Sequence, residues 1–516
     1  MWTGIQIVVT LFFMALTNNA SAKTVLFIPP PFTSYVVYHT NVAGALASLG
    51  HDVNIFVSES LLQKNLVKDK SVKVVTYGEN LGDIERRMYE TTRIVDKFWL
   101  RESTFGLKVL QDTCAEFVKL TNILLADQSF VDKVRNLNPD LIVLEAGPFT
   151  MNMIVLPYML DIPYALTGTV HDVVLSKVPF SPATTPFPLF TSSGRMSFTE
   201  RLESTIYYLV RINFDLFYDS SMVAKFAPHK PYKSINDLAA NAEVFIAEID
   251  HILDYPRTTL PNTKLVGGSS ASPAKQLEGE FKKFVDAADK GIIVMSFGGS
   301  VLNLPPEITS KMVSAFKQLD LRVVWKVNIT SPDLKQILTS KWIPQNDLLG
   351  HKKTKLFISH CGKNGQYEAL YHGVPILCLP IYGDQSYNAE RIKIKQFGLR
   401  ADMRDASADE LAAMMKEIIY NRKYTENIKK ASRLYRELYK VPKQQAAYWL
   451  DHVMKYGGEY MRSPGQQMLW YQLFVLDVFA FLIAVIIAAF LAIYFLVKWC
   501  YIKYRNNPRN AKSKQQ

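Results

Sequence analysis

The sequence predicts an α/β protein with two Rossmann-like halves followed by one membrane-spanning helix. Short apolar runs alternate with helix-like stretches twice along the chain, and the alternation restarts after a turn-rich passage at residues 254–272. An uncharged apolar run of about 20 residues at 478–497 is long enough to cross a bilayer as a helix. With 516 residues, 48% of them hydrophobic, the chain can bury two sizeable cores.

The N-terminal residues 1–22 are typical of a secretory signal. An apolar stretch at residues 5–16 is followed by Ala20, Ser21 and Ala22, which form a small-residue cleavage pattern. We therefore expect these residues to be outside the folded body.

The first half opens with a predicted βαβ unit. A strand at 25–28 is followed by a helix at 38–49, which Gly50 ends, and by a strand at 53–57. Later apolar runs predict further strands of a parallel sheet, at 141–144, 163–166 and 244–249. We place this domain at residues 23–255.

A long irregular loop is predicted at 178–194, where Pro, Ser and Thr are frequent. Loops of this length often shape binding pockets. We expect this one to serve the first domain in that way.

The second half, residues 256–465, repeats the alternation, and the division between the halves falls near Gly267 and Gly268. Predicted strands lie at 292–297, 323–327, 356–358 and 374–379, and predicted helices at 307–318, 408–420 and 423–439. Residues 443–461 are expected to lead back toward the first half.

The C-terminal residues 498–516 form a basic tail with six cations and no acid. The positive-inside bias places such a tail in the cytosol, so the body is lumenal and the chain is a single-pass type I protein. Trp470 and Trp499 flank the span as interfacial anchors. Lys512 and Lys514 resemble a dilysine retrieval signal, which predicts the endoplasmic reticulum membrane.

Charge, cysteine content and missing motifs argue against several classes of protein. About half of the net charge of +12 could come from the tail, and no basic patch is interleaved with aromatic residues, so we discount nucleic acid. The four cysteines are too few for a disulfide framework, and Cys361 and Cys378 are expected to be core thiols. No metal site is predicted. No Gly-x-Gly-x-x-Gly motif is present, which disfavours a nicotinamide enzyme.

Residues 357–385 carry the most specific signal in the chain. Their sequence runs from Phe-Ile-Ser-His-Cys-Gly-Lys-Asn-Gly-Gln-Tyr-Glu to Gly-Asp-Gln. Gly362 and Gly365 allow close approach of a ligand, and a helix beginning near Gly365 would seat a diphosphate at its N-terminus. His360 and Asn364 would add hydrogen-bond donors.

Three further side chains of this segment suit a nucleotide sugar. Glu368 lies one turn into the predicted helix, where its carboxylate can accept hydrogen bonds from ribose hydroxyls. Asp384 and Gln385 follow the next strand and could bind sugar hydroxyls. In open α/β sheets, ligands bind at the carboxyl ends of strands.

A second glycine turn, Gly298-Gly299-Ser300, follows the first strand of the second half. Its backbone N–H groups could meet the diphosphate from the opposite side. A plain turn between strand and helix explains these residues nearly as well.

The segment at 357–385 resembles the donor signature of the UDP-glycosyltransferase family, whose animal membrane members include the UDP-glucuronosyltransferases. Residues 342–349 also resemble that family, in which Trp342 would stack on uracil and Gln345 would reach the ribose. The resemblance implies the GT-B architecture, in which two Rossmann-like domains face each other.

The resemblance also implies an activity, the inverting transfer of glucuronate or glucose from a UDP-sugar to a small lipophilic acceptor. The UDP-sugar is a co-substrate, and no cofactor is expected. A homo-oligomer is compatible with these expectations.

The expected general base departs from the family pattern. The family carries a His after the first strand, and counting back from Gly50 places Tyr35 there, while Glu145 occupies the position of the partner acid. An unperturbed Tyr titrates near pH ~10, so Tyr35 is a poor base.

Three interpretations remain open. His39, one helical turn after Tyr35, could act as the base. The acceptor could instead be nucleophilic by itself, for example an amine. Alternatively, the chain is a catalytically impaired membrane protein that binds UDP-sugar or ligand, or a partner subunit.

Overall fold

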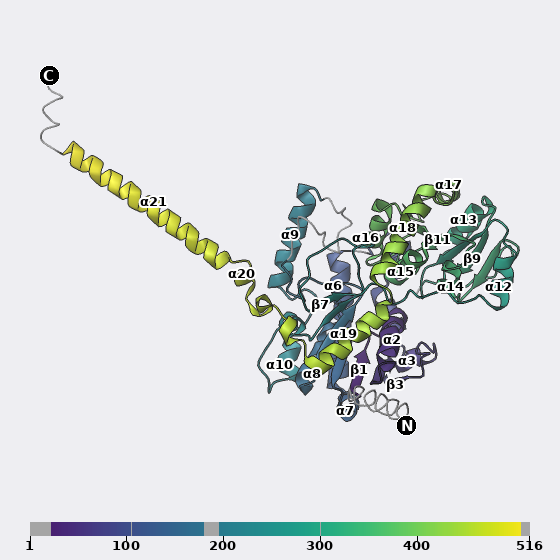
Figure 1. Cartoon of the computed structure of the whole chain (residues 1–516), viewed down its shortest axis with the longest axis horizontal. Coiled ribbons are helices and arrows are strands. Elements are labelled where there is room, and N and C mark those ends of the chain that lie inside the picture. Colours follow the sequence, from purple (N-terminus) through teal and green to yellow (C-terminus); the bar gives the residue numbers. More distant parts are fainter. Residues whose placement is uncertain (1–21, 105, 180–195, 300, 507–516) are drawn as a thin grey trace, which may run out of the picture. The chain divides into compact units, whose positions relative to one another are not determined.

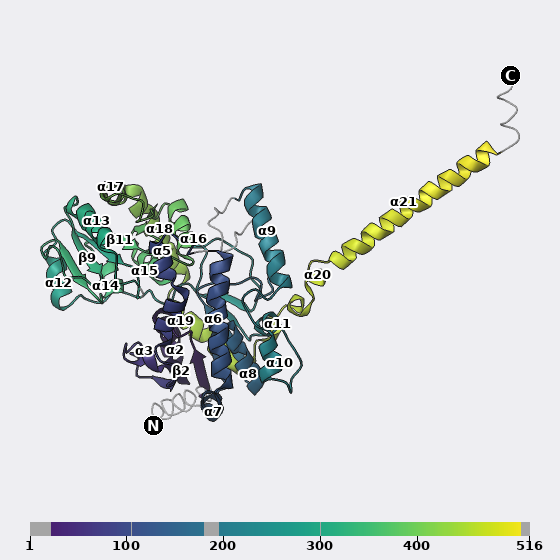
Figure 2. The same cartoon turned by 180° about the vertical axis from the view of Figure 1, so that it is seen from behind.

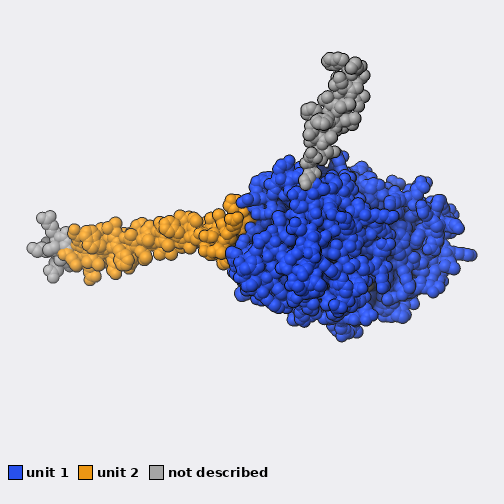
Figure 3. Space-filling view, turned by 90° about the horizontal axis from the view of Figure 1, so that it is seen from below, with its two compact units in different colours: residues 1–462 blue, residues 463–516 orange. Residues whose placement is uncertain are grey.

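The computed structural model describes residues 22–104, 106–179, 196–299 and 301–506. The predicted signal at 1–22 lies outside this range except for its last residue, as do Ser300, nearly all of the loop predicted at 178–194, and the tail from 507 onward. The chain divides into two compact units, residues 1–462 and 463–516, which Figure 3 colours separately.

The first half of the larger unit is built on a seven-stranded sheet in the order β3-β2-β1-β4-β5-β6-β7. All of its strand pairs are parallel, and Val25 of β1 pairs with Val53 and Leu141 on its two sides. The strands are β1 Thr24–Ile28, β2 Asp52–Ser58, β3 Val72–Tyr77, β4 Leu141–Glu145, β5 Tyr164–Gly168, β6 Phe245–Ala247 and β7 Thr263–Leu265.

Helices cover this sheet on both faces, as Figures 1 and 2 show from opposite sides. They are α2 Thr33–Ala47, α3 Glu59–Leu62, α4 Ile84–Thr92, α5 Ile94–Trp99, α6 Leu107–Ala126, α7 Gln128–Leu137, α8 Val155–Leu160, α9 Phe198–Asn213, α10 Ser221–Phe226 and α11 Ile235–Ala240, with a 3₁₀ turn at Met151–Ile154.

The second half has a six-stranded parallel sheet in the order β10-β9-β8-β11-β12-β13. The strands are β8 Ile292–Ser296, β9 Arg322–Lys326, β10 Ile337–Ser340, β11 Thr354–Ser359, β12 Ile376–Cys378 and β13 Gly398–Arg400. The helices are α12 Gly279–Asp286, α13 Pro306–Lys317, α14 Gln345–Leu349, α15 Lys363–His372, α16 Gln385–Ile394, α17 Ala408–Tyr420, α18 Arg422–Leu438 and α19 Pro442–Tyr456.

The start of α2 differs from the prediction of a helix at 38–49. The helix begins at Thr33, although the residues up to Tyr38 are mostly β-branched or aromatic and have low helix propensity. Glu85 of α4 accepts hydrogen bonds from the backbone N–H and the hydroxyl of Thr33, both at 3.0 Å. This tertiary cap satisfies a free donor of the first turn and places Tyr35 on the helix.

The first sheet extends past residue 255 to the glycine pair near which the sequence analysis divides the halves. Strand β7 pairs with β6, so the first sheet continues beyond residue 255 and ends just before Gly267. The Tyr435 hydroxyl accepts the N–H of Gly268 at 2.9 Å and donates to the carbonyl of Gly268 at 3.4 Å. The glycine pair therefore marks the crossover between the sheets.

Helix α19 returns to the first half, as predicted for residues 443–461. Ala446, Leu450 and Val453 are buried in the same apolar cluster as Val25 of β1, and Figures 1 and 2 both show α19 beside α2. In the other direction, Phe98 of α5 is buried in the core of the second half. Each half thus supplies a helix to the other.

The smaller unit contains α20, Trp470–Leu473, and α21, Leu476–Arg505. Helix α21 has 30 residues. Its most apolar segment has a mean hydropathy of 3.0, and no part of that segment is buried against the rest of the protein. The helix includes all of the predicted span at 478–497 and is long and apolar enough to cross a membrane.

We predict that Leu450→Ala destabilises the full chain, because this fully buried side chain of α19 belongs to the core of the first half. Such truncations cost about 2–5 kcal/mol. The matched control is Gln444→Ala on the exposed face of α19, which should cost under about 0.5 kcal/mol. Thermal unfolding of the detergent-solubilised protein measures both, and equal Tm values for the two variants would contradict the docking of α19.

Candidate active site

The segment at 357–385, called the signature below, lies at the carboxyl ends of the central strands of the second sheet. Strand β11 ends at Ser359, and Gly362 is the N-cap of α15, which begins at Lys363 rather than near Gly365 as predicted. Gly373 ends the helix in the left-handed conformation, with φ of 69°. The free N–H groups of the first turn of α15 therefore lie at this edge of the sheet.

One end of the site is formed by Gln345 and Glu368. Gln345 begins α14, and its Nε2 donates to Oε2 of Glu368 at 2.5 Å. Burial raises the pKa of Glu368 to about 7, against the opposing effects of Gln345 and of the positive charge of Lys326. A carboxyl with this pKa changes its charge near neutral pH.

Gly365 and Trp342 lie at the same end of the site as Gln345 and Glu368. A Cβ added at Gly365 would come within 3.2 Å of the ring of Phe357 and 3.5 Å of Gln345 Nε2, so the glycine leaves this surface open. Trp342 is 58% exposed and thus available for stacking. The Nζ atom of Lys68, from the first half, lies 5.6 Å from the Trp342 ring centroid.

His360 joins the two glycine turns in the middle of the site. A Cβ added at Gly298 would lie 3.1 Å from His360 Nε2, and one added at Gly362 would lie 2.6 Å from the same atom. Burial lowers the pKa of His360 to about 4, so its ring is neutral at physiological pH. Gly299 faces the first half, with Thr33 Cγ2 at 3.7 Å from an added Cβ.

Asn364 and Gln385 are held partly by main-chain contacts. The carbonyl of Asn364 accepts the hydroxyl of Ser270 at 3.2 Å. Oε1 of Gln385 accepts the N–H groups of Ile381 at 2.8 Å and Tyr382 at 3.1 Å, which leaves the amide N–H₂ end for other partners. Ser300 lies outside the described residues.

Across from this sheet, α2 and β4 of the first half bring His39 and Glu145 together. His39 Nε2 lies 3.2 Å from Glu145 Oε2, and both side chains are buried. The early start of α2 puts Tyr35 one turn before His39 on the same helix, where it is half-buried. The sequence suggested these three residues together, and the structure brings them to one place.

Burial is the largest influence on the pKa values of His39 and Glu145. It lowers the pKa of His39 to about 3. It also raises the pKa of Glu145 well above its usual range, and the charge of Glu248 adds to this effect. The pKa of Tyr35 is raised well above 10 by burial and then by the negative charges of Glu145 and Asp384. Tyr35 is therefore protonated, and it lies close to both carboxyl groups.

Glycines keep the space around Glu145 open. A Cβ added at Gly168 would come within 2.7 Å of Glu145 Oε1, and one added at Gly147 within 3.3 Å. The Gly147 backbone N–H also hydrogen-bonds this carboxyl and opposes the rise in its pKa. The longer Glu side chain is thus accommodated by the absence of side chains beside it.

Aromatic rings extend from Tyr35 into the first half. The ring of Phe32 lies 6.4 Å from that of Tyr35, 5.2 Å from Tyr89 and 5.5 Å from Phe117. Phe117 in turn lies 5.2 Å from Phe149. The sequence analysis did not identify this cluster, because its members come from four separate segments.

A cavity of about 610 Å³ opens beside Gly299. Its walls come from α4, α5 and the loop after β8, and both charge signs are present, for example Arg86, Arg93 and Glu90. These charges suit water or a polar group better than an apolar molecule.

The expectation that Cys361 and Cys378 are core thiols is wrong, because the two residues form a disulfide with a Cα–Cα distance of 5.5 Å. Cys378 ends β12 and pairs in register with Ser359 of β11, two residues before Cys361. The adjacency of the predicted strands could have indicated this bond. The disulfide fixes the turn that leads into α15.

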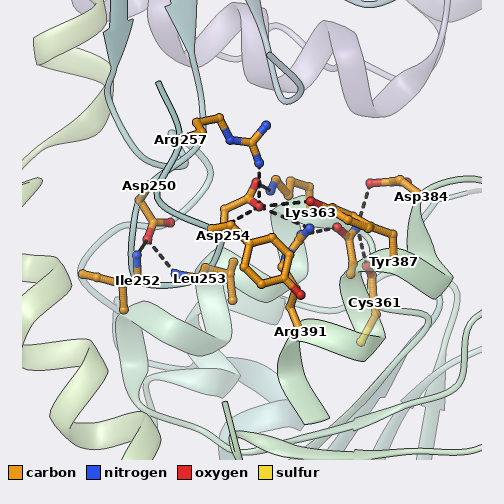
Figure 4. Close-up of polar contacts among 12 residues, drawn as sticks. Asp250, Ile252, Leu253, Asp254, Arg257, Cys361, Lys363, Asp384, Tyr387 and Arg391 are labelled. Carbon is orange, nitrogen blue, oxygen red and sulfur yellow. Dashed lines mark hydrogen bonds and ion pairs between the residues drawn. The ribbon is translucent and has the colours of Figure 1, made fainter. Parts of the chain in front are cut away.

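A buried ionic cluster adjoins the site and was also missed. Asp254, in the loop after β6, lies 2.8 Å from Arg257 Nη2, 3.3 Å from Lys363 Nζ and 3.4 Å from Arg391 Nη1. Figure 4 shows this carboxylate between side chains from both halves. Arg257 is three residues from Asp254, but Lys363 and Arg391 lie far along the chain, so sequence patterns could not connect them with this carboxylate.

Comparisons with known proteins identify the family to which the chain belongs. A family model described as "UDP-glucoronosyl and UDP-glucosyl transferase" matches residues 23–514. Human UDP-glucuronosyltransferase 2B17 is 29% identical over 525 residues, which cover 97% of this chain and 96% of that protein. Mouse UDP-glucuronosyltransferase 1A7 is 28% identical over 498 residues, which cover 93% of this chain and 91% of that protein.

Solved structures show the same fold. A UDP-glucosyltransferase from Polygonum tinctorium superposes with a TM-score of 0.58 at 16% identity, covering 85% of this chain and 99% of that one. The spinosyn forosaminyltransferase SpnP also gives 0.58 at 16% identity, covering 84% and 100%. The GT-B architecture expected from the sequence is thereby confirmed.

We predict that peptide mapping without reductant finds Cys361 linked to Cys378, with Cys114 and Cys500 as free thiols. A crosslink that closes a loop of this size contributes about 3 kcal/mol. The variant Cys361→Gly, Cys378→Ala should therefore melt several degrees lower, glycine being chosen because φ at 361 is 63°. Cys500→Ala is the control and should melt like the wild type, while alkylation of both signature cysteines without reductant would refute the pairing.

Proposed function

Since this chain belongs to the family of UDP-glucuronosyl and UDP-glucosyl transferases, a glycosyltransferase family that uses a UDP-sugar donor, we propose that it transfers glucuronate or glucose with inversion to a small lipophilic acceptor. The observation that carries this proposal is the contact of 3.2 Å between His39 and Glu145 on the half that faces the donor signature. A hydroxyl acceptor needs such a group to take its proton.

The donor would lie along the carboxyl edge of the second sheet. Its uracil would stack on Trp342, its ribose would donate to Glu368, and its diphosphate would meet the first turn of α15. Asp384 and Gln385, at the start of α16, would then contact the sugar. His360 would add a neutral N–H donor beside the diphosphate, and the N–H groups of Gly298 and Gly299 would meet it from the other side.

The acceptor would enter against the aromatic rings next to Tyr35. Phe32 and Phe149 are half-buried and pack by tilted contacts on the fully buried ring of Phe117, so their accessible ring surface favours flat, lipophilic molecules. This surface supports the acceptor class expected from the sequence.

His39 and Glu145 would act as one proton-accepting unit. The imidazole is neutral throughout the physiological range, and the Glu145 carboxyl at 3.2 Å would stabilise a proton that the ring takes up. His39 has no exposed surface, whereas Tyr35 is half-buried in front of the pair, so we assign the Tyr35 hydroxyl to pass the proton inward. As the acceptor oxygen bonds to the anomeric carbon, the bond from that carbon to the phosphate oxygen breaks, and UDP leaves.

We further propose that α21 anchors the enzyme in the endoplasmic reticulum membrane, with the catalytic body in the lumen. The support is the length and hydropathy of α21 together with the cations that follow residue 497.

The experiment that tests the proposed function measures UDP release by membranes expressing the chain. We expect release from UDP-glucuronate or UDP-glucose that depends on a pool of lipophilic phenols. Membranes that bind UDP but consume no UDP-sugar with any acceptor would contradict the transferase proposal.

Donor affinity is predicted to depend on pH through Glu368. Only the ionised carboxylate accepts from both ribose hydroxyls, and its pKa in the free protein is about 7. Protonation at lower pH therefore competes with binding, so UDP-sugar affinity should rise about tenfold between about pH 6 and about pH 8. Isothermal titration across this range measures the effect.

Glu368→Gln should remove this pH dependence. The matched control is Glu248→Gln, because Glu248 is also buried with a pKa of about 7 but accepts the Ser269 N–H and belongs to the first half. A flat wild-type profile, or a profile that only Glu248→Gln flattens, would contradict the role of Glu368.

Loss of the proton-accepting unit is predicted to lower kcat while donor binding is preserved. Glu145→Gln keeps the side-chain shape but cannot hold the proton, and kcat with a phenol should fall by about 10²–10³. Tyr35→Phe should lower kcat in the same direction if its hydroxyl passes the proton. Steady-state kinetics at saturating donor measure both, and an unchanged kcat in either variant would remove that residue from the mechanism.

A further inference from the structure

Asp384, the carboxylate proposed to hold the donor sugar, is itself held by a neighbouring amide. Asn388 lies one turn later on α16, and its Nδ2 donates to Asp384 Oδ2 at 2.6 Å. The same Nδ2 donates to the carbonyl of Cys361 at 3.1 Å. One amide group thus fixes both Asp384 and the turn that enters α15, and it leaves Oδ1 of Asp384 for a sugar hydroxyl.

The orientation of that amide is set by Arg391. Arg391 Nη2 donates to Asn388 Oδ1 at 2.5 Å. Because a guanidinium has donors only, the amide oxygen must face it, and the amide N–H₂ must then face Asp384 and Cys361. Arg391 is 1% exposed and its guanidinium carbon lies 4.0 Å from the Tyr387 ring centroid, so it has little freedom to move.

Arg391 is in turn anchored by a residue of the other half. Its Nη1 lies 3.4 Å from Asp254 Oδ1, and the Tyr387 hydroxyl also lies 3.4 Å from this oxygen. Asp254 is 3% exposed. Burial alone would raise its pKa, but the positive charges of Arg257, Arg391 and Lys363 outweigh burial and hold the pKa well below the usual range. Asp254 is therefore a carboxylate at any physiological pH.

We propose that Asp254 is a positioning residue for the donor sugar, because Arg391 and Asn388 transmit its position to the carboxylate that contacts the sugar. The inference rests on the proposed function, and it adds that the first half helps to order the sugar subsite of the second. Figure 4 shows Asp254 near the centre, Arg391 below it and Asp384 to one side. The uracil and ribose contacts at Gln345 and Glu368 lie outside the path.

The test compares UDP with UDP-sugar binding in the full-length protein. Arg391→Lys keeps the positive charge near Asp254 but lacks the second guanidinium nitrogen, which donates to Asn388. Affinity for UDP-glucuronate or UDP-glucose, whichever the wild type consumes, should fall at least tenfold or kcat should fall by that factor. Affinity for UDP should stay within about twofold, because UDP has no group at Asp384.

Two further variants separate positioning from general destabilisation. Asn388→Asp still accepts from Arg391 but donates to neither Asp384 nor Cys361, so it should give the same loss. Arg400→Lys is the matched control, because Arg400 contacts Glu390 on the same helix at 3.3 Å without any link to Asp384. It should leave both affinities unchanged.

The double variant Asp254→Asn, Arg391→Lys should lose no more UDP-sugar affinity than the single variant with the larger loss. Both residues act on one path, so their effects should not add. Equal losses of UDP and UDP-sugar affinity in Arg391→Lys and Asn388→Asp would overturn the inference in favour of a purely structural role. Unchanged UDP-sugar affinity and kcat in these variants would also overturn it. A wild-type protein that binds no UDP would instead overturn the proposed function.

Discussion

The buried carboxylate of Asp254 is the interaction on which the relation between the two halves depends. It belongs to the first half, and its cationic partners Lys363 and Arg391 belong to helices α15 and α16 of the second half. Charges buried this far from water are costly unless they are paired, and loss of one partner typically costs about 3–5 kcal/mol. The start of α15 and the side chain that orients Asp384 are therefore tied to the loop after β6.

Two reciprocal helix exchanges reinforce this tie. Helix α19 carries Leu450 into the core of the first half, while α5 carries Phe98 into the core of the second. The edges at which the parallel strands end are thereby kept opposite each other. In the proposed function one edge supplies the UDP-sugar contacts and the other supplies His39 and Glu145.

Much of this arrangement could be predicted from sequence, because local patterns encode it. Apolar runs located the central strands, and the spacing of His360, Glu368 and Asp384 pointed to a nucleotide-sugar site. Short or edge strands such as β3, β10 and β13 were missed, since brief or partly polar runs carry little periodic signal. The earlier start of α2 was missed because Glu85, distant in sequence, caps it.

The proposed proton-accepting pair, His39 and Glu145, illustrates what can and cannot be predicted from sequence. The spacing from Tyr35 to His39 allowed a shared helical face, but only the fold shows that Glu145 lies 3.2 Å from His39. Likewise, nothing in the sequence placed Asp254 beside Arg391, because this contact depends on how a loop of one half packs against a helix of the other.

The central claim is that the buried pair takes the acceptor proton while the signature holds the donor. The most direct measurement is kcat of His39→Ala with a phenol and with an aromatic amine of similar size, at saturating UDP-sugar. The account predicts a fall of about 100-fold or more for the phenol and a much smaller fall for the amine, which needs no base to become nucleophilic. Equal losses with both acceptors, or no loss with the phenol, would contradict it.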